Sequence, residues 1–216
     1  KQMPIPTGPW RSVDHSQHAF FTESMIDELA HAAKQDPLQY RRDLLQGKPR
    51  HLAIISRLEE MSNWQQTLPK GHGLGIAIHE CFGSIVGQVA EVSVLDGNLR
   101  VHRVACVADP GFAMSPDGYK AQMESGILYG MSAALSGSID IEGGAVKQSN
   151  FHDYPSVRMD TSPIIEVEIF NSGAPTGGAG EPGTPPIAPA ITNAIYAAVG
   201  VRVRELPIAK QGFNVA

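Results

Sequence analysis

Residues 177–186 read Gly-Gly-Ala-Gly-Glu-Pro-Gly-Thr-Pro-Pro, and they place one carboxylate, that of Glu181, among four glycines. Glycine reaches backbone conformations closed to other residues and lets a ligand approach the main chain, whereas proline fixes φ and removes an amide donor. The following residues, 187–200, are apolar and alanine-rich, with a proline near the start and a glycine at the end, which is typical of a buried helix. The stretch therefore predicts a tight loop that presents Glu181 at the N-terminus of a buried helix, where anionic groups are favoured.

Two other interpretations of this loop are available. A glycine- and proline-rich surface loop with a solvated glutamate would have a similar composition. A dinucleotide-binding fingerprint fits poorly, because the glycine spacing differs and no predicted strand runs directly into the glycines.

Composition narrows the possible classes of protein. The 216 residues can form one large domain or two small ones, and the 17 basic and 22 acidic residues give a net charge of −5. There is no basic stripe, so we expect no nucleic-acid partner, and no apolar run is long enough to cross a bilayer. Cys81 and Cys106 lack a metal-ligand spacing, so we expect no structural zinc, no iron–sulfur cluster and no protein ligand to a metal on this chain. Two buried thiols are the expected state, although an exported chain could pair them.

Hydrophobic periodicity predicts helices in the first third of the chain and strands after it. The helices are expected near residues 19–34, from Asp36 as N-cap with Pro37 at the first position to Gly47, and over residues 50–65. Antiparallel strands are expected over residues 75–82, 85–94 and 99–108, with a hairpin turn at 96–98. Further elements are a helix over 119–135, a hairpin turn at 142–144, a strand over 163–170 and a final strand over 201–207.

This order predicts an α+β fold in which N-terminal helices precede an antiparallel or mixed sheet with packed helices. We expect a loop and helical segment over residues 1–70 and an α+β segment over residues 71–216. Residues 1–10 contain no initiator methionine and no signal-peptide pattern, so we expect the chain to be the interior of a longer protein.

Several polar residues outside the glycine loop have both a structural and a functional interpretation. Arg11 follows Gly-Pro-Trp and either meets a ligand oxygen or stacks on Trp10 at the surface. His15 and His18 are more typical of polar loop or cap residues than of metal ligands, since two histidines without a third ligand are weak evidence for a metal. The pair His79 and Glu80 is interpreted as polar residues of a strand.

The amino-acid sequence of residues 178–190 resembles the C-terminal part of the molybdenum-binding large subunit of the xanthine dehydrogenase/aldehyde oxidase family. Within that family the likeness is to the isoquinoline 1-oxidoreductase beta-subunit branch, which includes membrane-bound aldehyde dehydrogenases. It covers essentially the whole chain but only part of a much longer subunit. The resemblance implies that Glu181 is the base beside the molybdenum.

The same resemblance extends to the cofactor-binding residues. It implies that Arg11 lies in a loop beside the molybdenum and that Gln122 hydrogen-bonds the pterin. Gly178 and Gly180 would let the cofactor approach the loop. The chain departs from the usual family motif at Ser125, because the family sequence has Glu-Gly where this chain has Glu-Ser-Gly.

The activity implied by the resemblance is hydroxylation of an aldehyde or an N-heterocycle with oxygen derived from water. The implied cofactor is molybdopterin cytosine dinucleotide, shared with the N-terminal remainder of the large subunit, and electrons would pass to [2Fe–2S] clusters on a small partner subunit. A cytochrome c subunit is a further partner in this branch, and a periplasmic or membrane-associated location is implied, with the cytoplasm left open. Because the family's other cofactor loops lie N-terminal to this piece, the alternative is an inactive fragment or a scaffold or binding module without cofactor.

Overall fold

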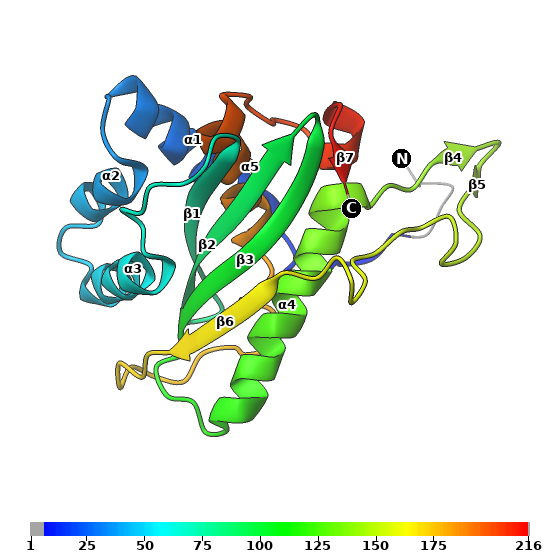
Figure 1. Cartoon of the computed structure of the whole chain (residues 1–216). Helices are drawn as coiled ribbons and strands as arrows, with labels where there is room; N and C mark the ends of the chain where they lie inside the picture. The colour runs from blue at the N-terminus through cyan, green and yellow to red at the C-terminus, as the bar shows by residue number, and fades with distance from the viewer. Residues whose placement is uncertain (1–6, 216) are drawn as a thin grey trace.

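The computed structural model describes residues 7–215, so residues 1–6, which contribute to the expectation of an incomplete chain, lie outside the described part. Three helices come first, as the periodicity predicts, and a mixed sheet with two long helices follows (Figure 1). Asp36 caps the second helix as expected, because its carboxylate accepts hydrogen bonds from the amides of Leu38 and Gln39. The helices are α1 (His15–Ala32), α2 (Pro37–Leu44), α3 (Pro49–Ser62), α4 (Pro116–Ser136), α5 (Ile187–Val199) and the short 3₁₀ helix η1 (Ile208–Gln211).

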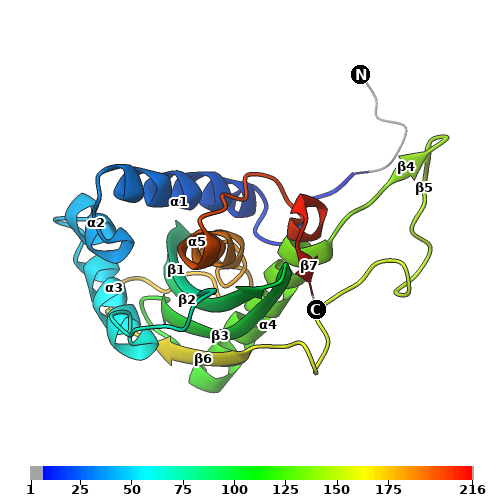
Figure 2. The ribbon, with the colours of Figure 1, turned by 45° about the horizontal axis from the view of Figure 1, so that its top comes forward.

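The main sheet has the order β1-β2-β3-β6, and the short strand β7 also pairs with β3. The first three strands form an antiparallel meander, as predicted, whereas β6 runs parallel to β3 after the chain crosses over through α4. The predicted second hairpin is present as the pair β4–β5, which projects away from the body (Figures 1 and 2). The strands are β1 (His72–Cys81), β2 (Ser84–Leu95), β3 (Asn98–Asp109), β4 (Ile141–Glu142), β5 (Ala145–Val146), β6 (Ile164–Ile169) and β7 (Asn214–Val215).

Side chains of the central strands alternate between two hydrophobic clusters, one on each face of the sheet. Ile76 and Ile78 of β1 pack with the helices α2 and α3, while Ala77 between them packs with α4 and α5. The cluster that includes α2 and α3 contains residues on both sides of position 70, so side chains pack across the predicted boundary between segments 1–70 and 71–216. The division into these two segments remains a prediction. Helices therefore pack against both faces of the central strands.

Buried charges connect α1 to α2 and to the segment after α5. Arg41 is fully buried and its Nε donates to Glu23 Oε2 at 2.8 Å, and the same oxygen accepts from the Ile78 amide at 3.0 Å. Arg202 forms an ion pair with Asp27 at 2.6 Å. Paired, hydrogen-bonded charges of this kind hold α1 in a fixed position at the β1 side of the sheet (Figure 2).

The prediction of a final strand over residues 201–207 is wrong. The Val-Arg-Val-Arg alternation is typical of a strand, but here the arginines face α1 and α5 rather than a neighbouring strand. Arg202 pairs with Asp27 and stacks on Tyr196, and Arg204 donates to Glu28 at 2.7 Å. These contacts pair the charged side chains of the segment without placing it in the sheet. Strand β7 pairs with β3 instead.

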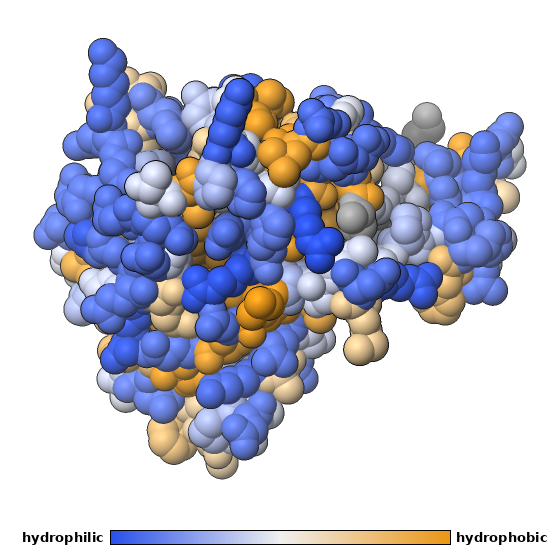
Figure 3. Space-filling view, in the orientation of Figure 1, coloured by the Kyte–Doolittle hydropathy of each residue, from blue (hydrophilic) through white to orange (hydrophobic). Residues whose placement is uncertain are grey.

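The outer surface carries exposed apolar side chains on several elements. In Figure 3 the hydrophobic residues of one face gather in a band over the edge strand β6, where Ile164 is 68% exposed. Phe21, Met25 and Leu29, one helical turn apart along α1, are also exposed. No helix of the described part combines the length and the apolar character that a membrane span requires.

Candidate functional site

The glycine loop enters from β6, crosses the ends of the central strands and continues into α5. Its path is fixed by the Gly178 amide, which donates to Phe82 O at 2.7 Å, and by the Ser84 hydroxyl, which donates to Gly178 O at 2.6 Å. Beyond the carboxylate, the buried amide of Gln88 donates to Gly183 O at 2.8 Å. The loop is therefore tied down on both sides of Glu181. Residues 182–187 are buried, so the loop makes one more enclosed turn between Glu181 and α5.

Glu181 is half-buried and is bonded to the segment that precedes α1. The Ser12 amide donates to Glu181 Oε1 at 3.0 Å, and the Ser12 hydroxyl donates to the Glu181 carbonyl at 2.8 Å. The Thr184 amide also donates to that carbonyl, at 3.0 Å. The Ser12 amide, 169 residues away in the sequence, thus orients the carboxylate, while Ser12 and Thr184 together hold the main-chain carbonyl.

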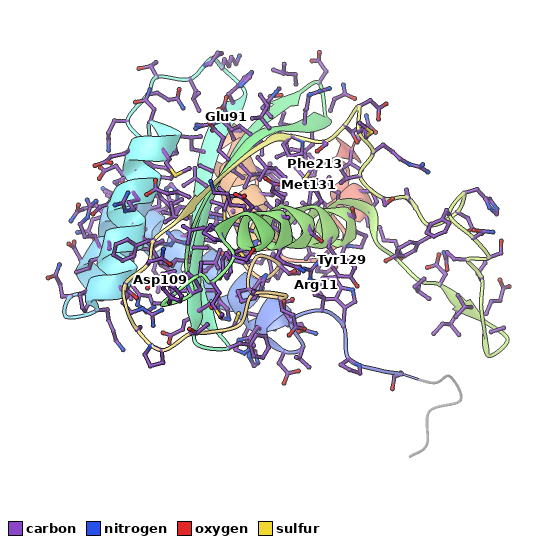
Figure 4. All side chains as sticks on the ribbon, turned by 90° about the horizontal axis from the view of Figure 1, so that it is seen from below. Arg11, Glu91, Asp109, Tyr129, Met131 and Phe213 are labelled. Carbon is purple, nitrogen blue, oxygen red and sulfur yellow. The ribbon has the colours of Figure 1, made fainter. Side chains whose placement is uncertain are left out.

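Arg11 joins the glycine loop to helix α4. Its Nε donates to Gly180 O at 2.9 Å, and its terminal nitrogens donate to Ser125 Oγ and Gln122 Oε1, each at 3.1 Å. The guanidinium carbon lies 5.5 Å from the centre of the Tyr129 ring, and Figure 4 shows Arg11 and Tyr129 together along α4. The aromatic partner of Arg11 is therefore Tyr129, and the interpretation in which Arg11 stacks on Trp10 is wrong.

The contact with Arg11 determines how the Gln122 amide is oriented. A guanidinium has only donors, so the oxygen of the amide must face it. The two N–H donors of Gln122 are consequently directed away from Arg11. Gln122 lines a hollow of about 270 Å³ between the glycine loop and the start of α4, together with Ser115, Tyr119 and Gly177.

The glycines of the loop differ in how much space their surroundings leave for a side chain. A Cβ at Gly177 would lie 2.5 Å from Gly83 C and from Ser84 Oγ, and one at Gly178 would lie 3.0 Å from Phe82 Cβ. A Cβ at Gly180 would meet no atom within 4 Å. The packing of the described chain thus explains the first two glycines, whereas at Gly180 it leaves open space beside the backbone.

Two titratable groups near the end of β1, Cys81 and His79, are uncharged at neutral pH. Burial, together with the charges of Glu181 and Glu80, raises the pKa of the Cys81 thiol to about 12. Burial and the neighbouring His15 and His18 lower the pKa of His79 to about 4. Neither group therefore supplies a charge that would neutralise the carboxylate.

His15, expected to be a polar loop or cap residue, is paired with His79, expected to be a polar strand residue. His15 is the first residue of α1, so this helix begins earlier than predicted, and its Nδ1 lies 2.9 Å from Nε2 of His79 in β1. Glu80 points outward and is half-exposed. In the described residues no group of three or more potential ligands is arranged to hold a metal ion, and both cysteines are free and buried.

The structure brings four of the five predicted site residues into one bonded group, namely Glu181, Gly180, Arg11 and Gln122, with Gly178 next to it in the loop. Sequence reasoning missed Ser12 as a member of this site. Ser125 was noted only as a departure from the usual family motif, although the Ser125 hydroxyl accepts a hydrogen bond from Arg11. A small hydroxyl residue directly after Arg11 carried no local signal for a contact with Glu181, 169 residues away.

The chain as a whole is similar to known proteins of one family. The sequence model of the molybdopterin cofactor-binding domain matches residues 16–163, a range that contains Gln122 but not Arg11 or Glu181. The chain is 36% identical over 203 residues to isoquinoline 1-oxidoreductase subunit beta of Brevundimonas diminuta, covering 92% of this chain and 26% of that protein. It is 34% identical over 225 residues to a membrane-bound aldehyde dehydrogenase of Gluconacetobacter polyoxogenes, covering 92% of this chain and 28% of that protein. The chain thus spans about a quarter of the length of these relatives.

A solved structure shares the fold over almost the whole chain. The aldehyde oxidoreductase of Desulfovibrio gigas superposes with a TM-score of 0.69 at 14% identity, covering 92% of this chain and 40% of that chain. At this level of identity the likeness shows the α+β architecture alone.

Proposed function

Because this chain belongs to the molybdopterin cofactor-binding domain family, as the C-terminal part of a molybdenum-binding subunit of the xanthine dehydrogenase type, we propose that it supplies the catalytic base and one wall of the cofactor site of a molybdenum hydroxylase. The proposed reaction is the oxidation of an aldehyde or an N-heterocycle, with Glu181 as the base. In this proposal Arg11, Gln122, Gly178 and Gly180 border the cofactor.

The observation that carries the proposal is the position of the Glu181 carboxylate within a bonded group that, among residues 7–215, also presents amide donors without a partner and open backbone. The Gln122 amide directs two donors away from Arg11, and Gly180 leaves space in which a side chain would otherwise stand. A pterin offers ring nitrogens and oxygens as acceptors, and it needs close approach to a backbone. The residues present therefore fit such a group.

Each residue has a distinct task in this proposal. The molybdenum cofactor, when bound, supplies the oxygen-transfer chemistry and accepts the two electrons. Glu181 accepts the proton released as the new carbon–oxygen bond forms, and a positioned general base of this kind contributes about 10²–10⁴ in rate. Gln122 donates to an acceptor of the cofactor. Arg11 bonds to the oxygens of Gln122 and Gly180, and so holds the two sides of the site together.

The remaining components of the enzyme are inferred from the relatives. We propose that the N-terminal remainder of the large subunit completes the site and that the cofactor is molybdopterin cytosine dinucleotide. Electrons would leave through [2Fe–2S] clusters on a small partner subunit. A cytochrome c subunit would then accept them, if the assembly has one. A periplasmic or membrane-associated location follows from the same reasoning.

The test is Glu181→Gln in the complete subunit that contains this chain, assayed with its electron-transfer partner. This change keeps the shape of the side chain and removes the base. We expect turnover to fall by at least about 10²-fold, with molybdenum content and melting temperature close to those of the unmodified enzyme. Retained turnover would show that another group is the base, and loss of molybdenum would show that Glu181 holds the site together instead.

A second measurement addresses the alternative of a fragment or scaffold without cofactor. Purified alone, the chain should contain no stoichiometric molybdenum and should acquire it only together with the N-terminal remainder. A complete subunit that folds but never binds molybdenum would favour the scaffold.

A further inference from the structure

Ser12 has an unusual combination of burial and backbone conformation. It is fully buried, and its φ of +73° lies in the left-handed region that residues with a Cβ rarely occupy. Val13 continues the same conformation with φ +49°. Backbone of this kind persists only where surrounding contacts determine it, and such positions gather at functional sites.

Local hydrogen bonds hold the turn around Ser12. The Val13 amide donates to Trp10 O at 2.8 Å, the His15 amide donates to Ser12 O at 2.9 Å, and the Ser16 hydroxyl donates to Arg11 O at 3.2 Å. The turn is thus anchored both to itself and to the start of α1. The turn directs the amide and the hydroxyl of Ser12 towards the glycine loop.

Both groups of Ser12 bond to the same residue at two different places. The amide donates to Oε1 of the Glu181 side chain, and the hydroxyl donates to the Glu181 main-chain carbonyl. One residue therefore sets both the backbone position and the side-chain direction of Glu181. In the part of the chain that the structure describes, no hydrogen bond reaches Oε2, so that oxygen is left to accept a proton.

We propose that Ser12 is a positioning residue that holds the Glu181 carboxylate with Oε1 occupied and Oε2 presented to the substrate. This inference rests on the proposed role of Glu181 as the base. It adds to that role a left-handed turn, more than 160 residues earlier in the chain, that determines which oxygen reacts.

The test compares Ser12→Ala with Ser12→Gly in the complete enzyme. Both variants lose the hydroxyl, but only glycine adopts the left-handed conformation without a steric cost, and so only glycine should keep the amide directed at Oε1. We expect Ser12→Ala to lower kcat by about tenfold, since small misplacements of a reacting group are costly. KM and molybdenum content should stay the same, and Ser12→Gly should lose clearly less. Ser56→Ala is the matched control, because the Ser56 hydroxyl donates within α3, to Leu52 O, away from the loop.

A readout besides activity follows the hydrogen bond itself. Amide exchange of a peptide that contains Ser12 should be slow in the unmodified enzyme and faster in Glu181→Ala, which removes the acceptor. Unchanged exchange in that variant would contradict the inference.

Double variants separate this inference from the proposed function. Combined with Glu181→Gln, Ser12→Ala should cost no further turnover, because Ser12 acts through that carboxylate. Additive losses would overturn the role of Ser12, as would equal kcat in the alanine, glycine and unmodified enzymes, or a loss of kcat that only follows lost molybdenum. Retained turnover in Glu181→Gln alone would instead overturn the proposed function.

Discussion

Arg11 and Gln122 are separated by 111 residues in the chain, yet a terminal nitrogen of Arg11 lies 3.1 Å from the amide oxygen of Gln122. The same guanidinium donates to Gly180 O, so a single side chain joins the segment before α1, helix α4 and the glycine loop. Three acceptors around one planar donor group require the fixed fork of arginine.

Arg11→Lys tests this arrangement. Lysine keeps the positive charge but cannot bond to all three acceptors, which are exposed, so we expect a loss of about 0.5–1.5 kcal/mol in the free energy of unfolding. In the complete enzyme the molybdenum content should also fall, because the Gln122 amide is no longer held in one orientation. Melting temperature and metal analysis check the two effects. Arg100→Lys, at an exposed position of β3, is the control and should change neither.

The glycines of the loop provide a matched pair of substitutions. Gly177→Ala places a Cβ 2.5 Å from the backbone of Gly83, which must move, so we expect about 1–3 kcal/mol of destabilisation from overpacking. The Cβ of Gly180→Ala meets no atom of residues 7–215 within 4 Å, so this change should leave the melting temperature unchanged. In the complete enzyme, however, Gly180→Ala should lower turnover or molybdenum content, because it fills space proposed for the cofactor. A normal Gly180→Ala enzyme would remove this residue from the proposed cofactor site.

The His15–His79 pair predicts a pH dependence of stability. Burial lowers the pKa of His79 from 6.5 in the unfolded chain to about 4, so the unfolded state binds the proton first. The stabilisation is therefore complete above pH 6.5 and is lost as the pH falls from 6.5 towards 4. Because His79 is partly exposed, we expect a loss of the order of 1–2 kcal/mol rather than the full shift.

Urea unfolding between pH 7.5 and pH 4.5 measures this effect. The difference in stability between the unmodified chain and His79→Gln should shrink over that range, since glutamine does not titrate. Ser56→Ala, at a position that does not titrate, should give parallel curves. A constant difference for His79→Gln would show that His79 does not carry the pH dependence.

The sequence was sufficient for features that depend on neighbours in the chain. Hydrophobic spacing located the helices and the antiparallel strands, the Asp36-Pro37 pair located the start of α2, and the density of glycine around Glu181 marked the loop. These signals are local, because side-chain periodicity and turn chemistry act within a few residues.

The tertiary structure decided everything that depends on which distant groups meet. The alternating residues 201–207 have the pattern of a strand, but Arg202 and Arg204 pair with acidic residues of α1, which periodicity cannot reveal. For the same reason the sequence offered Arg11, Gln122 and Glu181 as separate candidates. Only the folded chain places them in one hydrogen-bonded group and adds Ser12, because a backbone amide has no side-chain signature and acquires a role only when the fold gives it an acceptor.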